Sequence, residues 1–279
     1  MKRSFMLLFI ILFSTTLFAQ NQKPASPWKN ELSIGIGLGQ VSYSNWTRGG
    51  EEQLSWTFNL LGSSIYEGKV FKWTNALKIN YGQNKTGNSI NKVTQNDLLF
   101  NSMLSYKSGW VFDYFAGLNL ITQIAPGYNY DLAGNPQVNT FFDPADITES
   151  AGLVYSKGDN FKTQLGVALH QVVANTYYAK TDDPTTTDIE KFIFETGIES
   201  ITTFRWDFMQ NAFWETYLRF FSAFDRLDTW DVRWDNTITG KVNSLINVNL
   251  TWTVIYDVRE TLKTQVKEAL QVGISYRLL

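Results

Sequence analysis

The feature that most constrains this chain is an alternation of apolar and polar residues with a period of two, shown best by its C-terminal segment. In Thr264–Leu279 one set of alternate positions forms an almost purely apolar stripe, whereas the other set is polar or small. The stripe comprises Val266, Leu270, Val272, Ile274, Tyr276 and Leu278. A period of two indicates a β-strand with one face in an apolar medium and the other against polar groups. This pattern is typical of the last strand of an outer-membrane barrel, although a soluble β-sandwich ends in the same way.

The N-terminus has the pattern of a secretory signal peptide. Lys2 and Arg3 precede an apolar run from Phe5 to Phe13, and a small residue follows at Ala19. Cleavage is expected after Ala19 or the next residue. We therefore predict a signal peptide at 1–19, a periplasmic lead-in at 20–31 and a single β-domain at 32–279.

Composition narrows the class of protein further. The chain has no Cys, so disulfides and thiolate metal sites are excluded, and its net charge of −2 argues against a nucleic-acid surface. Aromatic residues make up 15% of the chain, yet the mature part has no stretch long and apolar enough for a transmembrane helix. Many aromatic residues and strands that are apolar on one face only are typical of transmembrane β-barrels.

The alternation recurs along the chain and predicts twelve strands. They are expected at 32–40, 54–60, 71–81, 98–106, 110–120, 148–155, 161–171, 191–206, 214–220, 230–238, 246–256 and 264–279. Connections after odd-numbered strands run longer, including the predicted loops at 83–92, 124–147, 172–190 and 257–263. An even number of strands with long loops at one end and tight turns at the other is the layout of an outer-membrane barrel. The first strand carries Gly35, Gly37 and Gly39 on its polar face, where small residues leave room or permit sharp curvature.

Tryptophan positions support the same fold. Trp73, Trp110, Trp206 and Trp214 fall near the predicted tight turns, and Trp230 falls near the opposite end. Such placement predicts aromatic girdles at two membrane interfaces. The predicted fold is therefore an all-β, twelve-stranded antiparallel transmembrane barrel in the outer membrane.

One segment resembles a known family. Ser44-Asn45-Trp46, followed by Gly49-Gly50-Glu51 and a strand beginning Leu-Ser, resembles an uncharacterised outer-membrane barrel family of Bacteroidota, domain of unknown function number 3078. Further matching features are Trp73 with Ala76–Leu77, Tyr81-Gly82, Ala125–Tyr128 and Gly273–Arg277, so the resemblance covers essentially the whole mature chain. The chain departs from the pattern at Arg48 and by its extra last residue, Leu279. The resemblance implies a fold and a location but no activity.

Most charged strand residues share the polar parity and are expected to line the lumen. The candidate lumen residues are Lys72, Lys78, Asp97, Asp113, Lys162, His170, Glu195, Glu199, Glu215, Arg219, Asp231, Arg233, Asp235, Lys267 and Arg277. The ninth and tenth strands are expected to place Glu215 and Arg219 beside Asp231, Arg233 and Asp235. Charges in a narrow interior must pair or stay wet, so a wall-to-wall ionic network and a narrow hydrophilic conduit are both open interpretations.

Catalytic and metal sites are not expected. His170 is the only histidine, and no Ser–His spacing provides a nucleophile with its base and orienting group. Asp182, Asp183 and Asp188 lack the spacing and the glycine of a calcium loop, so a solvated loop is the better interpretation. No cofactor is predicted.

The sequence thus predicts a barrel without enzymatic activity, either a narrow passive channel for small polar solutes or a structural barrel. An integral outer-membrane hydrolase is the disfavoured alternative. The expected partners are outer-membrane lipid and, during biogenesis, the barrel-assembly machinery. The Ser44–Glu51 element is expected in the first outward loop, as a tight turn with an interfacial Trp46 or as a docking or gating loop.

Overall fold

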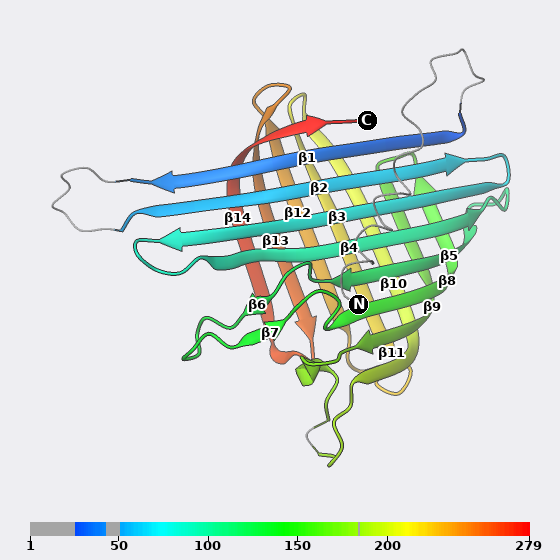
Figure 1. Cartoon of the computed structure of the whole chain (residues 1–279). Helices are drawn as coiled ribbons and strands as arrows, with labels where there is room; N and C mark the ends of the chain where they lie inside the picture. The colour runs from blue at the N-terminus through cyan, green and yellow to red at the C-terminus, as the bar shows by residue number, and fades with distance from the viewer. Residues whose placement is uncertain (1–25, 43–50, 184) are drawn as a thin grey trace, which may run out of the picture.

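The computed structural model describes residues 26–42, 51–183 and 185–279 and forms a closed barrel of twelve antiparallel strands (Figure 1). The barrel strands are β1 (Trp28–Val41), β2 (Gln53–Glu67), β3 (Phe71–Thr86), β4 (Lys92–Tyr106), β5 (Asp113–Thr122), β8 (Ala145–Lys157), β9 (Phe161–Val173), β10 (Phe192–Met209), β11 (Ala212–Ala223), β12 (Asp231–Lys241), β13 (Ile246–Asp257) and β14 (Thr261–Arg277). The predicted all-β barrel of twelve antiparallel strands is confirmed. The predicted signal peptide and, apart from Glu51, the Ser44–Glu51 element lie outside the described residues.

Each strand pairs with the next barrel strand along the chain, and β1 pairs with β14 to close the barrel. A separate two-stranded sheet, β6 (Gly127–Tyr128) and β7 (Gln137–Asn139), lies in the long connection between β5 and β8. The connection between β9 and β10 holds the single-turn 3-10 helix η1 (Tyr178–Lys180). In the part of the chain that the structure describes, no helix is long and apolar enough to cross a membrane.

The connections largely follow the predicted rhythm. Those at 68–70, 107–112, 158–160, 210–211 and 242–245 define the short-turn end, and those at 42–52, 123–144, 174–191 and 224–230 define the long-loop end. Two long-loop connections are shorter than predicted, because β3 and β4 extend through much of 83–92 and β14 already begins at Thr261. β1 likewise begins at Trp28, inside the predicted lead-in. In these extensions the residues are mostly polar, so the alternation that predicts a strand is weak.

The barrel is largely apolar on its outer face, and most of its polar strand residues face the interior. On β9, Leu165 and Val167 are 59% and 60% exposed, whereas Gln164 and His170, which point inward, are 5% and 3% exposed. The register aligns the outer stripes into rows, such as Ile34–Leu60–Ile79–Leu98 across β1–β4. Strands with this alternation are suited to a lipid exterior and a polar lumen.

Aromatic side chains form a belt around the short-turn end. Trp28 lies 5.3 Å from Tyr66 and 5.9 Å from Trp73, measured between ring centroids. Further along the rim, Tyr155, Phe161, Phe204 and Trp214 follow one another at 6.0–6.4 Å. The strand bounds place Trp73, Trp110, Trp206 and Trp214 at this end and Trp230 at the other. The positions predicted for these tryptophans are confirmed.

Neighbouring strands approach each other closely where certain glycines face inward. Figure 1 shows β1–β4 crossing the front at a steep angle to β10–β14 behind them. Gly152 and Gly166 pair with each other on β8 and β9, and a Cβ on Gly166 would collide with the carbonyl oxygen of Ala151. At the opposite edge, a Cβ on Gly273 would lie 2.9 Å from the carbonyl oxygen of Ile36. The absence of a side chain at these glycines therefore permits the close backbone approach at both places.

The substitution Gly166→Val is expected to destabilise the barrel, because the new side chain would meet the backbone of β8. Overpacking of this kind costs about 1–3 kcal/mol of unfolding free energy. Gly117→Ala is the matched control, since its Cβ would come no closer than 3.5 Å to any other group. Urea unfolding in detergent micelles measures both. Equal midpoints for the two variants would contradict the role assigned to Gly166.

Candidate functional site: an ion-pair network at the long-loop end

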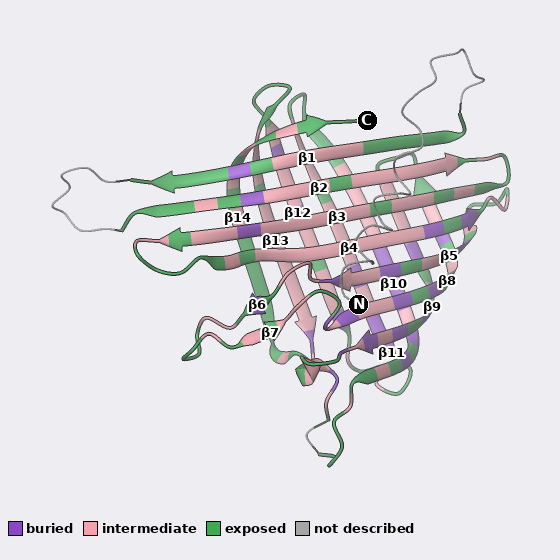
Figure 2. Cartoon of the chain, in the orientation of Figure 1, coloured by how far each residue is buried: buried purple, intermediate pink, exposed green. Residues whose placement is uncertain are grey.

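The lumen is filled on one side. Several inward-facing residues of β9–β11 are almost fully buried, including Glu199, Ile201 and Phe221, and Figure 2 shows most of the buried segments gathered on β8–β11. Inside this wall Arg219 donates from Nε to Glu199 Oε1 (2.8 Å) and from Nη2 to Thr148 Oγ1 (2.9 Å). The Thr148 contact joins β11 to β8 across the interior. This half of the barrel therefore behaves as a packed core.

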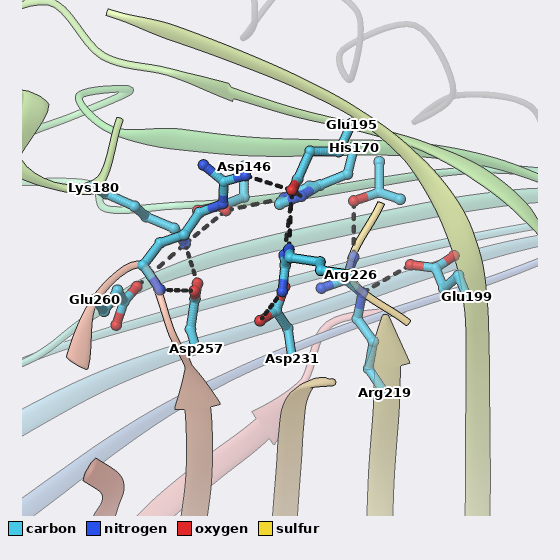
Figure 3. Close-up of polar contacts among 12 residues, drawn as sticks. Asp146, His170, Lys180, Glu195, Glu199, Arg219, Arg226, Asp231, Asp257 and Glu260 are labelled. Carbon is cyan, nitrogen blue, oxygen red and sulfur yellow. Dashed lines mark hydrogen bonds and ion pairs between the residues drawn. The ribbon is translucent and has the colours of Figure 1, made fainter. Parts of the chain in front are cut away.

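At the long-loop end, cations from the loops reach inward to carboxylates of the wall (Figure 3). Lys180, in η1, places Nζ 2.8 Å from Asp146 Oδ1 on β8 and 2.9 Å from Asp257 Oδ2 on β13. It also contacts Glu260 Oε1, in the β13–β14 turn, at 3.2 Å. Burial disfavours the charged amine, but the three carboxylates outweigh it and hold the pKa of Lys180 above its ordinary value.

A second loop cation and a third meet at Glu195 of β10. Arg226, in the β11–β12 loop, donates from Nε to Glu195 Oε1 (3.1 Å) and from Nη2 to Asp231 Oδ2 (2.7 Å). Arg259, in the β13–β14 turn, also pairs with Glu195 Oε1. Burial opposes the charge of Arg226, yet its two carboxylate partners raise the pKa of the guanidinium. Three of the long-loop connections are thus fixed over the lumen by ion pairs.

His170 connects the ion pairs of Lys180 with those of Glu195. We call the whole set the mouth network; it comprises Asp146, His170, Lys180, Glu195, Arg226, Asp231, Asp257, Arg259 and Glu260. Its Nδ1 lies 3.3 Å from Glu195 Oε2 and its Nε2 lies 3.3 Å from Asp146 Oδ1. The ring packs edge-on against Phe221 at 4.9 Å. Because both ring nitrogens already face carboxylates, the imidazole has no nitrogen left to accept a proton from a nucleophile.

Asp143, in the β5–β8 connection, binds the backbone of the β9–β10 connection. Its carboxylate accepts hydrogen bonds from the backbone N–H groups of Asn175 (2.8 Å), Thr176 (2.9 Å) and Tyr177 (3.2 Å). Partial burial would raise the pKa of Asp143, but these three donors outweigh it and lower the pKa below its ordinary value. The long β5–β8 and β9–β10 connections are therefore joined directly to each other.

The other predicted lumen charges also face inward. Arg219 lies opposite Arg233 and diagonal to Asp231 and Asp235, and Glu215 lies diagonal to Asp235, so the charges of β11 and β12 lie side by side as expected. The ion pairs themselves are local or cross the lumen: Arg233–Asp235, Arg205–Glu215, Lys72–Glu67, Arg277–Glu31 and Lys267–Asp97. Asp113 accepts from the backbone N–H of Ser108 at 3.0 Å. Lys78 and Lys162 have no ion-pair partner within the described ranges.

Several members of the mouth network were not predicted. Lys180, Arg226, Arg259 and Glu260 lie in connections and Asp146 lies at a strand end, where alternation gives no information. The local sequence around a charged loop residue does not tell whether its side chain is solvated or folds into the mouth.

Two outward carboxylates, Glu149 on β8 and Glu268 on β14, interrupt the apolar stripes of their strands. Among the described residues, no group of three or more His, Asp or Glu side chains is arranged to hold a metal ion.

Acid is expected to release the loops that Asp143 joins. A carboxylate whose pKa is lowered by folding stabilises the fold above its ordinary pKa of about 4 and loses that contribution as pH falls. Hydrogen exchange of the backbone at 175–177, corrected for the intrinsic pH dependence, should rise on going from pH 7 to pH 3. Asp143→Asn should exchange fast at both pH values. The exposed loop variant Asp131→Asn serves as the control and should behave like the parent chain.

One protein-family model matches part of this chain. The family model described as "Protein of unknown function (DUF3078)" matches residues 38–128, which confirms the predicted resemblance over that part of the chain. A comparison with curated proteins finds no match. Among solved structures, the COG4313 outer membrane channel from Pseudomonas putida F1 is 11% identical, with 94% of this chain and 98% of that chain covered and a TM-score of 0.41.

Two further solved structures are similar in the same limited sense. The translocator domain of the autotransporter NalP from Neisseria meningitidis is 9% identical over 92% of this chain and 90% of that one, with a TM-score of 0.35. The outer membrane channel DcaP of Acinetobacter baumannii is 8% identical over 93% and 99%, with a TM-score of 0.33. Residues 38–128 thus match a family of unknown function, and the match brings no activity with it.

Proposed function

We propose that this chain is an integral outer-membrane protein and a narrow passive channel for small polar solutes, held closed at the long-loop end by the mouth network. Export by a cleaved signal peptide and insertion by the barrel-assembly machinery are part of the proposal. The apolar exterior, the aromatic belt and the polar interior support the membrane location.

The half of the lumen between β1–β3 and β12–β14 supports a conduit. Leu61 of β2 points inward and is still 50% exposed, and its inward neighbour Ala76 on β3 is also exposed. The facing positions are short and polar, among them Ser33, Ser63 and Asn247. This contrasts with Glu199 on the filled side, which is 1% exposed.

The observation that carries the proposal is the division of charge in the mouth network. The wall supplies the carboxylates Asp146, Glu195, Asp231 and Asp257, whereas the loops supply the cations Lys180, Arg226 and Arg259. Because the cations sit on separate connections, they can leave the mouth without unfolding the wall. Their departure would leave a ring of carboxylates at an entrance that small cations and neutral polar solutes could pass.

A structural barrel is the second candidate function. The packed half of the lumen favours it, because Met103, Phe115 and Val154 form an apolar cluster inside the wall near the short-turn end. A hydrolase is disfavoured because His170 is buried and has carboxylates at both ring nitrogens.

Planar-bilayer recording of the refolded protein tests the channel. Lys180→Met removes one cation that contacts three carboxylates, so the mean current should rise more than tenfold and favour cations over anions. Lys191→Met, in the same connection and exposed, is the matched control and should leave the current unchanged. Absence of current at any voltage, in the parent chain and in Lys180→Met alike, would favour the structural barrel.

Location is tested separately in cells. The protein should fractionate with the outer membrane and migrate on gels at different positions before and after boiling, as a folded barrel does. Recovery of the folded protein from the soluble periplasmic fraction would contradict the proposed location.

A further inference from the structure

The seam between β1 and β14 has fewer paired positions than any other junction between barrel strands. β1 pairs with β14 over five positions, from Ser33↔Arg277 to Gly37↔Gly273, but with β2 over fourteen. One further backbone hydrogen bond, from Leu278 N to Leu32 O (2.7 Å), extends the seam at the short-turn end. The barrel is therefore closed mainly in its short-turn half.

Beyond Gly37 and Gly273 the two strands separate. Leu38–Val41 of β1 pair only with β2, and 261–272 of β14 pair only with β13. Figure 1 shows β1 continuing across the front while β14 runs away behind the sheet. We call this region, bounded by 38–41 and 261–272, the split. It lies on the long-loop side of the seam.

An unpaired strand edge cannot face hydrocarbon, because its N–H and C=O groups would have no hydrogen-bond partners. Such an edge is tolerated at membrane depth only where it lines a water-filled cavity, and the polar inward side chains around the split indicate that water in the lumen reaches it. From Leu262 to Glu268, β14 is exposed on both faces. Its inward residues there include Gln265 and Lys267, and its outward residues include the carboxylate Glu268, which lies opposite Trp252.

The rim of the split has two chemical characters. Facing outward are Leu38 and Leu270, which are 67% and 72% exposed. Facing inward are Gln271 and Lys267, with Gly39 across the gap. Lys267 Nζ reaches Asp97 Oδ2 on β4 at 2.9 Å, so its charge lies across the lumen just inside the split. An opening that is apolar outside and polar inside suits a molecule with one apolar chain and one polar head.

We propose that the split is a lateral portal through which single-chain amphiphiles pass between the lumen and the membrane leaflet on the long-loop side. The polar head lies against Gln271 and the Lys267–Asp97 pair, and the chain leaves between Leu38 and Leu270. Passage needs no chemical step. The portal is independent of the conduction of small polar solutes, because the mouth network includes no residue of β1 or β14.

Spin labels test the geometry. If the seam continued in register, Gln40 would lie opposite Leu270, so Gln40→Cys with Leu270→Cys reports the split in a chain with no native cysteine. Ile34→Cys with Tyr276→Cys, a pair inside the seam, is the matched control. In proteoliposomes the label-to-label distance should be clearly longer at 40/270 than at 34/276. Equal distances would mean a closed seam and would overturn the proposal.

Lipid-borne chemistry tests passage. Ala269→Cys, inward at the split, and Ala76→Cys, inward behind paired strands, are each treated with a maleimide on a twelve-carbon chain dissolved in the bilayer. Ala269→Cys should react at least tenfold faster than Ala76→Cys, whereas a water-soluble maleimide should label both. Comparable rates with the lipid-borne reagent would overturn the portal. Each variant is first checked for folding by its heat-dependent gel mobility.

Discussion

The backbone hydrogen-bond ladder is the constraint on which this structure depends. A strand inside a membrane can satisfy its N–H and C=O groups only through neighbouring strands, so a barrel must close on itself. Here eleven of the twelve junctions are long, and the last, between β1 and β14, is paired over five positions. The missing backbone hydrogen bonds are all at this one junction, which makes it the weakest part of the wall.

The short seam lies at one of two edges of the barrel where glycines let strand backbones come very close together. At one edge Gly152, Gly166 and Gly197 let neighbouring backbones approach until no Cβ would fit. At the other edge Gly273 does the same for the seam, where a Cβ would meet the backbone of Ile36, and the strands diverge directly after the Gly37–Gly273 pair. Between the edges, one half of the interior is packed and the other stays accessible.

The sequence was sufficient for the architecture because each membrane strand repeats the same physical demand every two residues. That alternation predicted all twelve barrel strands, the inward direction of Glu199 and Arg219, and the end at which Trp73 and Trp214 lie. It could not predict which charges pair, since a shift of register by two residues keeps every side chain on its face but changes its neighbour. It also could not find Lys180, Arg226 or Asp143, whose contacts depend on how long connections fold over the mouth.

The mouth network and the split lie at the same end of the barrel but on different elements. The network ties the loops to β8, β10, β12 and β13, with Lys180 also reaching the β13–β14 turn through Glu260. Buried ion pairs repay their desolvation only when each charge has well-placed partners, so losing one loop cation weakens the hold on the others. The seam, by contrast, is held by backbone hydrogen bonds and by the Arg277–Glu31 ion pair at its short-turn end. Opening the mouth therefore leaves the β1–β14 pairing intact, and widening the split leaves the wall carboxylates with their cations.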